Sequence, residues 1–301
     1  MESIIEPVKK DLLLAELTRA TELTEASRGD IKVYSIDASF PSLLREIGRL
    51  REIAFRSGGG GTGKECDVDR FDLDPNLGFK QLVVWDDALQ CIVGGYRIIF
   101  GKDVRLNGKG QPDIPASHIF KFSKKFIHED LPHTMELSRS FIAEQYQRTN
   151  AARKSIFILD CLFKAICVVC RDSGITDIFG KVTFYQDYSP RAFALITAFM
   201  KKHCKADRSI VPTPAYRVKL PKEAGGILAG DSLKANLRAL IANLAQHGEY
   251  LPPILKSYLN LTSTIKYYGS AVNDSFGNVV EMGMKLHVPD LDSERWALYF
   301  K

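Results

Sequence analysis

The chain has 301 residues, of which 45% are hydrophobic and 26% are charged, so it can bury a core and is not disordered as a whole. Lysine and arginine number 41 against 36 acidic residues, an excess that suits an acidic partner but is too small to indicate nucleic acid. No apolar run is long enough to span a membrane, and the N-terminus lacks a signal-peptide pattern. We therefore expect a cytoplasmic protein rather than a secreted or integral membrane one.

The first half of the chain is predicted to mix helices and strands around one glycine-rich segment. That segment is residues 57–76, which we interpret as a mobile loop because glycine has the most backbone freedom. Apolar spacing and turn residues predict the elements on either side. These are helices over 7–28 and 39–55, and strands over 31–36, 81–86, 91–100 and 135–144.

The second half continues the mixture, and the pattern shifts after residue 220. Together the elements predict an α/β (α+β) fold whose N-terminal half is mostly antiparallel. The predicted helices cover 151–171, 190–203, 232–247, a short stretch from Leu251, and 290–300; the predicted strands cover 177–184, 210–218, 265–272 and 279–287.

Three patterns have the spacing of a chemical site without its other parts. Cys167 and Cys170 have C-x-x-C spacing inside an apolar segment, which favours buried thiols over a metal or redox site. Residues 58–64 fit the first part of a nucleotide P-loop, but the next residue is Glu65 instead of serine or threonine. His128 and His133 fit a solvated loop better than a metal site. We predict no metal and no resident cofactor.

Four short motifs follow one another in the sequence. They are Arg51-x-x-x-Phe55, Asp69-x-x-Asp72, Gly94-x-x-Arg97 and Glu136-Leu-Ser-Arg139. Any one of them could be a surface ion pair, but their order and spacing together are more specific.

This constellation resembles the GNAT-related N-acyltransferases that take fatty acyl groups from acyl carrier protein. Two branches share it, the acyl-homoserine lactone synthases and the ornithine or glycine N-acyltransferases, often labelled hemolysin-like. The tail, with Leu251-Pro-Pro-Ile-Leu-Lys-Ser-Tyr-Leu259 and 269–288, is similar to the second branch. The resemblance covers about residues 32–290. The first 30 residues, predicted to form an N-terminal helix, fall outside it. The resemblance implies a GNAT-like domain over 31–220 with a mixed, mostly antiparallel sheet flanked by helices, and a smaller helix-plus-hairpin extension over 221–301.

The resemblance makes Glu136 and Arg139 the candidate catalytic residues. In a regular strand these two side chains face opposite sides, so we predict a β-bulge near 136–140, as in the fourth strand of the GNAT fold. A backbone N–H freed by the bulge would bind the pantetheine arm or the thioester oxygen. Glu136 would take a proton from the acceptor ammonium. The alternative for Glu136 is an ion pair with Arg97 or Arg139.

The other motif residues are candidates for acceptor binding. Asp69 and Asp72 would hold the acceptor ammonium, although they could instead cap a loop. Arg97 would bind the acceptor carboxylate, and Arg51 would hold one of the aspartates in place. The spacing does not separate these two arginine roles. Phe55 is expected in the wall of the site.

The donor side is predicted from the segment after the last motif. GNAT enzymes bind the pyrophosphate of coenzyme A with a glycine-containing loop, and both glycines are missing from Gln147–Arg153. This departure disfavours coenzyme A, and the resemblance implies acyl carrier protein as the donor, with its single phosphate near Arg148, Arg153 and Lys154. Six lysines are expected either to dock this acidic protein or to form a solvated basic face. They are Lys121, Lys124, Lys125, Lys201, Lys202 and Lys205.

The expected reaction is transfer of a fatty or 3-hydroxy fatty acyl group from acyl carrier protein to the α-amine of glycine or ornithine, the first step of amino-acid lipid synthesis. Because such a product is an amphiphile, we also expect peripheral contact with the inner membrane. Two alternatives remain: an acyltransferase that makes an acylated amine signal, and a lipid-binding or membrane-active protein without enzymatic activity.

Overall fold

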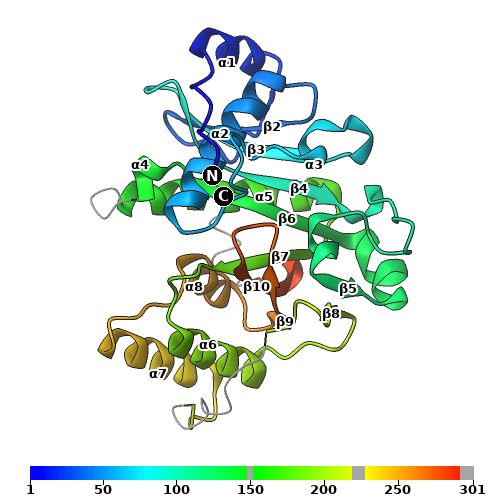
Figure 1. The fold of residues 1–301 in the computed structure, drawn as a ribbon, viewed down its shortest axis with the longest axis vertical. Helices are drawn as coiled ribbons and strands as arrows, with labels where there is room; N and C mark the ends of the chain where they lie inside the picture. The colour runs from blue at the N-terminus through cyan, green and yellow to red at the C-terminus, as the bar shows by residue number, and fades with distance from the viewer. Residues whose placement is uncertain (148–151, 219–227, 292–301) are drawn as a thin grey trace.

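A mixed sheet forms the centre of the molecule (Figure 1). The computed structural model describes residues 1–147, 152–218 and 228–291. The eight strands lie in the order β1-β2-β3-β4-β6-β7-β10-β9. All neighbours are antiparallel except β6 and β7, which are parallel. The strands are β1 (Thr21–Glu22), β2 (Ile31–Ile36), β3 (Lys80–Asp86), β4 (Cys91–Phe100), β6 (Thr134–Ile142), β7 (Asp177–Phe184), β9 (Lys266–Asn273) and β10 (Val279–His287).

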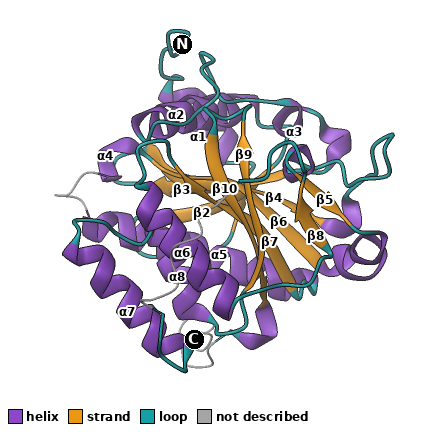
Figure 2. Cartoon of the chain, turned by 60° about the horizontal axis from the view of Figure 1, so that its bottom comes forward, coloured by secondary structure: helices purple, strands orange, loops and turns teal. Residues whose placement is uncertain are grey.

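Helices cover both faces of this sheet, as Figure 2 shows. One face carries α1 (Lys10–Leu17), α2 (Pro41–Ser57) and α3 (Arg70–Leu73), together with the small β5 (Phe120–Phe122) and β8 (Ile210–Pro212) pair. The other face carries α5 (Ala152–Ser173), α6 (Pro190–His203), α7 (Leu233–Gln246) and α8 (Pro253–Leu261), and α4 (Glu144–Gln147) follows β6. Among the described residues, no helix has both the length and the apolar character needed to cross a bilayer.

The helix α2 illustrates why these residues fold as they do. Pro41 at its first turn has the backbone angle of a helix, and its missing N–H would have no helical partner there. Leu43, Leu44 and Ile47 recur at helical spacing and are buried against the sheet. Arg51 stands two turns further along and is also buried, so α2 carries a charged group into the interior.

Two apolar clusters share the α2 face of the sheet. One contains Trp85 with residues of α1 and α2, and the other contains Phe179 with residues around β5 and β8. A third, larger cluster fills the opposite face beneath α5 to α8. Three buried charged residues lie on the α2 face beside these clusters: Arg51 of α2, Arg97 of β4 and Glu136 of β6. Their charged groups are therefore surrounded by apolar side chains.

The predicted β-bulge is present in β6. Arg97 of β4 pairs with Ser138, and Gly95 pairs with Phe141, so β6 has one more residue than β4 between these pairs. Arg139 lies in this extra length and adopts φ 53°, in the left-handed region. On its other side β6 pairs with β7 only from Thr134 to Leu137, so the two strands stop pairing where the bulge begins.

Most predicted elements are confirmed, including the mixed, mostly antiparallel sheet flanked by helices. The predicted first helix over 7–28 is wrong after Leu17, because the chain turns there and enters β1. The predicted strand over 210–218 ends at Pro212, and β5, which pairs with it, was not predicted. Most of the predicted helix over 290–300 lies outside the described residues. The segment after residue 220 supplies β9 and β10 to the same sheet as the rest of the chain.

Candidate active site

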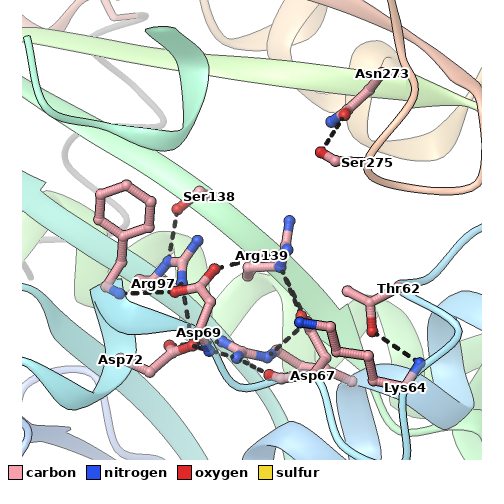
Figure 3. A network of polar contacts seen from close by, with 12 residues as sticks. Thr62, Lys64, Asp67, Asp69, Asp72, Arg97, Ser138, Arg139, Asn273 and Ser275 are labelled. Carbon is pink, nitrogen blue, oxygen red and sulfur yellow. Dashed lines mark hydrogen bonds and ion pairs between the residues drawn. The ribbon is translucent and has the colours of Figure 1, made fainter. Parts of the chain in front are cut away.

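Three arginines and three aspartates form one network beside the bulge: Arg51, Arg97, Arg139, Asp67, Asp69 and Asp72. Figure 3 shows the three aspartates with Arg97 and Arg139. Arg51 is central to the group: its guanidinium contacts both oxygens of Asp72, at 3.2 and 2.9 Å, and lies 3.1 Å from Asp67. It also donates to the backbone carbonyl of Asp67. The side chains of all three residues are 1% exposed. Arg51 thereby fixes the loop before α3 to the middle of α2.

Arg97 continues the network from β4. Its Nη1 contacts Asp69 at 2.8 Å and Asp72 at 3.2 Å, and its Nε donates to the Ser138 hydroxyl at 3.1 Å. Arg97 is completely buried, whereas 31% of the Asp69 side chain is exposed. Asp69 is therefore the carboxylate through which this network reaches the surface. Gln81 adds a hydrogen bond to Asp72 at 2.8 Å.

Arg139 joins the network from the bulge itself. Its Nε lies 2.9 Å from Asp67, and its Nη2 lies 3.8 Å from Asp69. The guanidinium also lies over the ring of Phe276, 4.7 Å from the centroid. Phe276 in turn makes an edge-on contact with Phe55, with centroids 5.0 Å apart. The Arg139 side chain is thus held between Asp67 and Phe276, and these contacts fix the left-handed backbone of the bulge.

The charges in this network stabilise one another. Burial by itself would raise the pKa of Asp72, but Arg51 and Arg97 hold that pKa well below its ordinary value. Burial would lower the pKa of Arg139, and Asp67 raises it above the usual value. Asp72 and Arg139 are therefore stabilised in their charged forms by their partners in the network.

A cavity of about 320 Å³ opens where β6 and β7 stop pairing. Its size is within the range of small-molecule sites. The wall includes the bulge from Leu137 to Ile142, Lys181 and Thr183 of β7, and Tyr185, which follows β7. Aromatic and aliphatic side chains supply much of the remainder: Phe55, Tyr96, Leu159, Tyr250, Ile254, Tyr258 and Phe276. Phe55 is one of these wall residues, and its place in the wall of the substrate site stays a prediction.

Glu136 is outside the described cavity wall; it directly precedes the wall residue Leu137 and lies on the same face of β6 as Ser138, which lines the cavity. It is 4% exposed, and neither carboxylate oxygen has a hydrogen-bond partner of ordinary geometry among the described residues. Burial raises the pKa of Glu136 to about 7, against the opposing influence of Lys181 and Arg97. The alternative role of Glu136, an ion pair with Arg97 or Arg139, is not seen among the described residues. Glu136 is a buried carboxyl that can exchange a proton near neutral pH.

The predicted acceptor-binding residues differ in their access to the cavity. Arg51, Asp72 and Arg97 bind one another, are at most 3% exposed, and are absent from the described cavity wall. This arrangement favours a positioning role for all three. Arg139 lines the cavity and Asp69 is partly exposed, so a direct substrate contact stays a prediction for these two.

Four polar residues near the cavity were missed by the sequence analysis. Asp67 joins Arg51 to Arg139. Lys181 of β7 lies 3.0 Å from Glu281 of β10, which accepts a hydrogen bond from Asn273 at 3.0 Å. A carboxylate at position 281, between Val280 and Met282 in a mainly apolar stretch, is the one available sequence signal. The partner of Glu281 becomes visible only once β7 and β10 are paired.

The predicted donor-binding residues are only partly described. Arg148 and the side chain of Arg153 lie outside the described residues. Lys154 is exposed at the start of α5, with its ammonium 5.8 Å from the Tyr146 ring centroid. Its contact with the donor phosphate stays a prediction.

The predicted docking lysines lie on other elements. Lys121 belongs to β5, which Figures 1 and 2 place on the opposite side of the molecule from α4. Lys202, at the end of α6, donates to the carbonyls of Leu228 and Gly230. The docking role of this group stays a prediction, and the structure gives it no link to the cavity.

A GNAT-type acyltransferase is the class of protein that this fold and site define. The family model described as "Acetyltransferase (GNAT) domain" matches residues 50–155, which run from α2 through the bulge to the start of α5. Two curated relatives extend the match to the whole chain. A glycine N(alpha)-acyltransferase of Bacteroides thetaiotaomicron is 40% identical over 97% of this chain and 87% of the relative. One of Phocaeicola vulgatus is 37% identical over 97% of this chain and 90% of the relative.

The chain therefore belongs to the family of these glycine N(α)-acyltransferases, and the predicted family is confirmed. Among solved structures, an N-acyl amino acid synthase from uncultured soil microbes aligns with 86% of this chain and 92% of its own, at 9% identity and a TM-score of 0.41.

Proposed function

We propose that this acyltransferase moves a fatty acyl group from the thioester of acyl carrier protein to the α-amine of glycine. The names of the two curated relatives support glycine over ornithine as the acceptor. The N-acyl amino acid formed would be the first intermediate of an amino-acid lipid. A separate enzyme would then add an ester-linked chain.

The observation that carries this proposal is the cavity at the bulge, with ionised groups on one side and aromatic walls on the other. An acyl thioester needs an apolar wall, and an amino acid needs charged groups. Tyr96 and Tyr258 meet through their hydroxyls at 3.2 Å on the apolar side, and Arg139 lies on the charged side. The bulge between Ser138 and Phe141 interrupts the β4–β6 ladder beside the place where both substrates would meet.

Glu136 is the proposed proton acceptor. The acceptor ammonium loses a proton to this carboxylate, directly or through a water chain, and the neutral nitrogen attacks the thioester carbon. A backbone N–H of the bulge stabilises the oxyanion that forms. The carbon–sulfur bond then breaks, the thiolate takes the second proton of the nitrogen, and one proton is released overall.

Acyl carrier protein is proposed as the donor because the chain lacks the two glycines with which GNAT enzymes approach a pyrophosphate. The donor arm would enter near Gln147 of α4 and Leu159 of α5, which both line the cavity. This direction lets the thioester reach the bulge from the α5 face while glycine occupies the charged side.

The purified protein should convert glycine to N-acylglycine when supplied with a palmitoyl or 3-hydroxypalmitoyl thioester of acyl carrier protein, as measured by mass spectrometry. We expect the matching coenzyme A thioester to be a much poorer donor, and ornithine a poorer acceptor. Equal rates with both thioesters would overturn the donor assignment. Absence of any N-acyl amino acid with either donor would overturn the proposed function.

A further inference from the structure

We propose that Lys181 and Glu281 form the subsite that binds the zwitterion of the acceptor amino acid. Lys181 receives the acceptor carboxylate, and Glu281 receives its ammonium. This inference rests on the proposed function and deepens it, because it assigns the acceptor site to residues outside the four sequence motifs.

The pairing of two strands brings these side chains together. Thr183 of β7 lies directly opposite Glu281 of β10, and Lys181 lies opposite Gly283, so the three side chains share one face of the sheet. The Lys181 Nζ lies 3.0 Å from the Glu281 Oε2, and each side chain is 7% exposed. All three of these side chains belong to the cavity wall.

Both charged groups keep capacity for a ligand. An ammonium has three N–H donors, and one faces Glu281. The contacts of Glu281 with Lys181 and Asn273 both use Oε2, while the side chain borders the cavity. An ion pair in an apolar wall is weak support for stability, since apolar residues of similar volume often do as well. A binding role accounts for its position at the cavity.

The charge pattern matches an α-amino acid. A zwitterion laid beside the pair can place its negative end on Lys181 and its positive end on Glu281, so that all four charges alternate in sign. Tyr185 and Phe276 also line the cavity.

The position of Glu136 fits the same arrangement. Glu136 pairs with Phe179 in the parallel β6–β7 ladder, and Lys181 is the next residue of β7 on that face. Lys181 and Glu281 both act electrostatically on the Glu136 carboxyl. An ammonium held at Glu281 would therefore lie beside the proposed proton acceptor.

The test compares two lysines that occupy equivalent positions on the same strand pair. Lys285 of β10 lies 3.0 Å from Asp177 of β7 and is outside the described cavity wall, so Lys285→Met is the matched control for Lys181→Met. Steady-state kinetics with an acyl carrier protein thioester should show a KM for glycine about 10–100-fold higher in Lys181→Met than in wild type. The KM for the donor should stay within about twofold, and Lys285→Met should leave both constants unchanged.

Calorimetric titration with glycine, without donor, makes the test independent of turnover. Wild type and Lys285→Met should bind glycine, and Lys181→Met and Glu281→Gln should bind it at least about 10-fold more weakly. Glycinamide, which lacks the carboxylate, should bind wild type less well than glycine. Thermal melting of each variant reports folding, and Lys181→Met with Glu281→Gln removes both charges if a single variant unfolds.

The outcomes separate the two proposals. Equal glycine binding by Lys181→Met and Lys285→Met, or equal binding of glycine and glycinamide by wild type, overturns the subsite. If wild type binds glycine through Lys181 but forms no product with either thioester, the subsite stands and the proposed transfer fails. If product forms and the KM for glycine is unchanged in Lys181→Met, the transfer stands and the subsite fails.

Discussion

Arg51 and Asp72 form a bidentate ion pair that joins the middle of α2 to the first turn of α3, with N–O distances of 3.2 and 2.9 Å. Asp72 accepts the Asp69 N–H at 2.9 Å in a capping box at the same turn. It also meets Arg97 and Gln81. One buried carboxylate thus joins two helices and two strands.

The first prediction concerns the stability that the Asp72 carboxylate provides through these contacts. Asp72→Asn should lower the free energy of unfolding by roughly 3–5 kcal/mol, because it leaves buried guanidinium groups without their charge partner. Urea denaturation at neutral pH measures the effect. Activity should fall as well, since Arg97 and Arg139 reach the bulge through the same network.

Asp74→Asn is the matched control for this change. Asp74 follows Asp72 by two positions, is exposed, and accepts from the Asn76 N–H, a contact that asparagine can reproduce. We expect its unfolding curve to overlay that of wild type. Similar curves for Asp72→Asn and Asp74→Asn would show that the network contributes little to stability.

The second prediction concerns Glu136 and stability. Its folded-state pKa is raised to about 7 by burial, so the folded protein binds the proton more tightly than the unfolded chain does. The contribution of Glu136 to stability is therefore full at pH values below the ordinary carboxyl pKa and is lost as the pH rises through about 7. Glu136→Gln removes this pH-dependent loss. We therefore expect its free energy of unfolding at pH 8 to exceed that of wild type by at most about 3 kcal/mol, with a correspondingly higher melting temperature.

The same substitution should have the opposite effect on turnover. Wild-type kcat should rise with pH through about 7, as the carboxyl becomes a proton acceptor, and Glu136→Gln should lose most of this rise along with about 100-fold or more in kcat. Thermal melts and pH–rate profiles of the two proteins provide both measurements. If Glu136→Gln is less stable than wild type at pH 8 and keeps the wild-type pH–rate profile, both the predicted effect of Glu136 on stability and its role as proton acceptor are contradicted.

The family resemblance predicted that five motif residues meet at one site. Arg51, Asp69, Asp72, Arg97 and Arg139 are in one network. The bulge was predictable only through the family resemblance, since a strand pattern alone gives no reason for an extra residue at Arg139. The roles of these residues stay predictions.

What the sequence did not reveal depends on contacts between distant segments. Glu281 and Lys181 are a hundred positions apart, and only the β7–β10 register brings them together. The glycine-rich segment was interpreted as mobile, yet the buried Glu52 side chain accepts from the N–H groups of Thr62 and Gly63, at 3.0 and 2.8 Å. A glutamate inside a helix gives no sign that it will anchor a loop ten residues later.

The third prediction isolates the left-handed backbone at Arg139. Arg139→Ala and Arg139→Gly both remove the guanidinium and its contacts with Asp67 and Phe276. They differ in the free energy needed to hold φ at 53°, because glycine adopts this angle freely and alanine does not. We expect Arg139→Gly to be more stable than Arg139→Ala by about 1 kcal/mol in urea denaturation. If alanine is as stable as glycine, the bulge relaxes when its side chain is lost.

The fourth prediction concerns the contact between the glycine-rich loop and the cavity wall. A Cβ added at Gly60 would lie 2.9 Å from Cε1 of Tyr185 and 3.4 Å from Cε1 of Phe276. Both rings line the cavity, so Gly60→Ala should displace the wall as well as the loop. We expect a loss of about 1–3 kcal/mol in stability and a lower kcat/KM for glycine. Gly108→Ala is the control, because its added methyl group meets nothing within 4 Å and its φ is not left-handed.

A double-mutant cycle shows whether the Tyr185 ring is the cause. In a Tyr185→Ala background the ring is absent, so the stability cost of Gly60→Ala should shrink by at least about 0.5 kcal/mol relative to its cost in wild type. Urea denaturation of the four proteins gives this coupling directly. Strictly additive costs would mean that the added methyl group acts on the loop backbone alone, and that Gly60 does not set the position of the wall beside the acceptor.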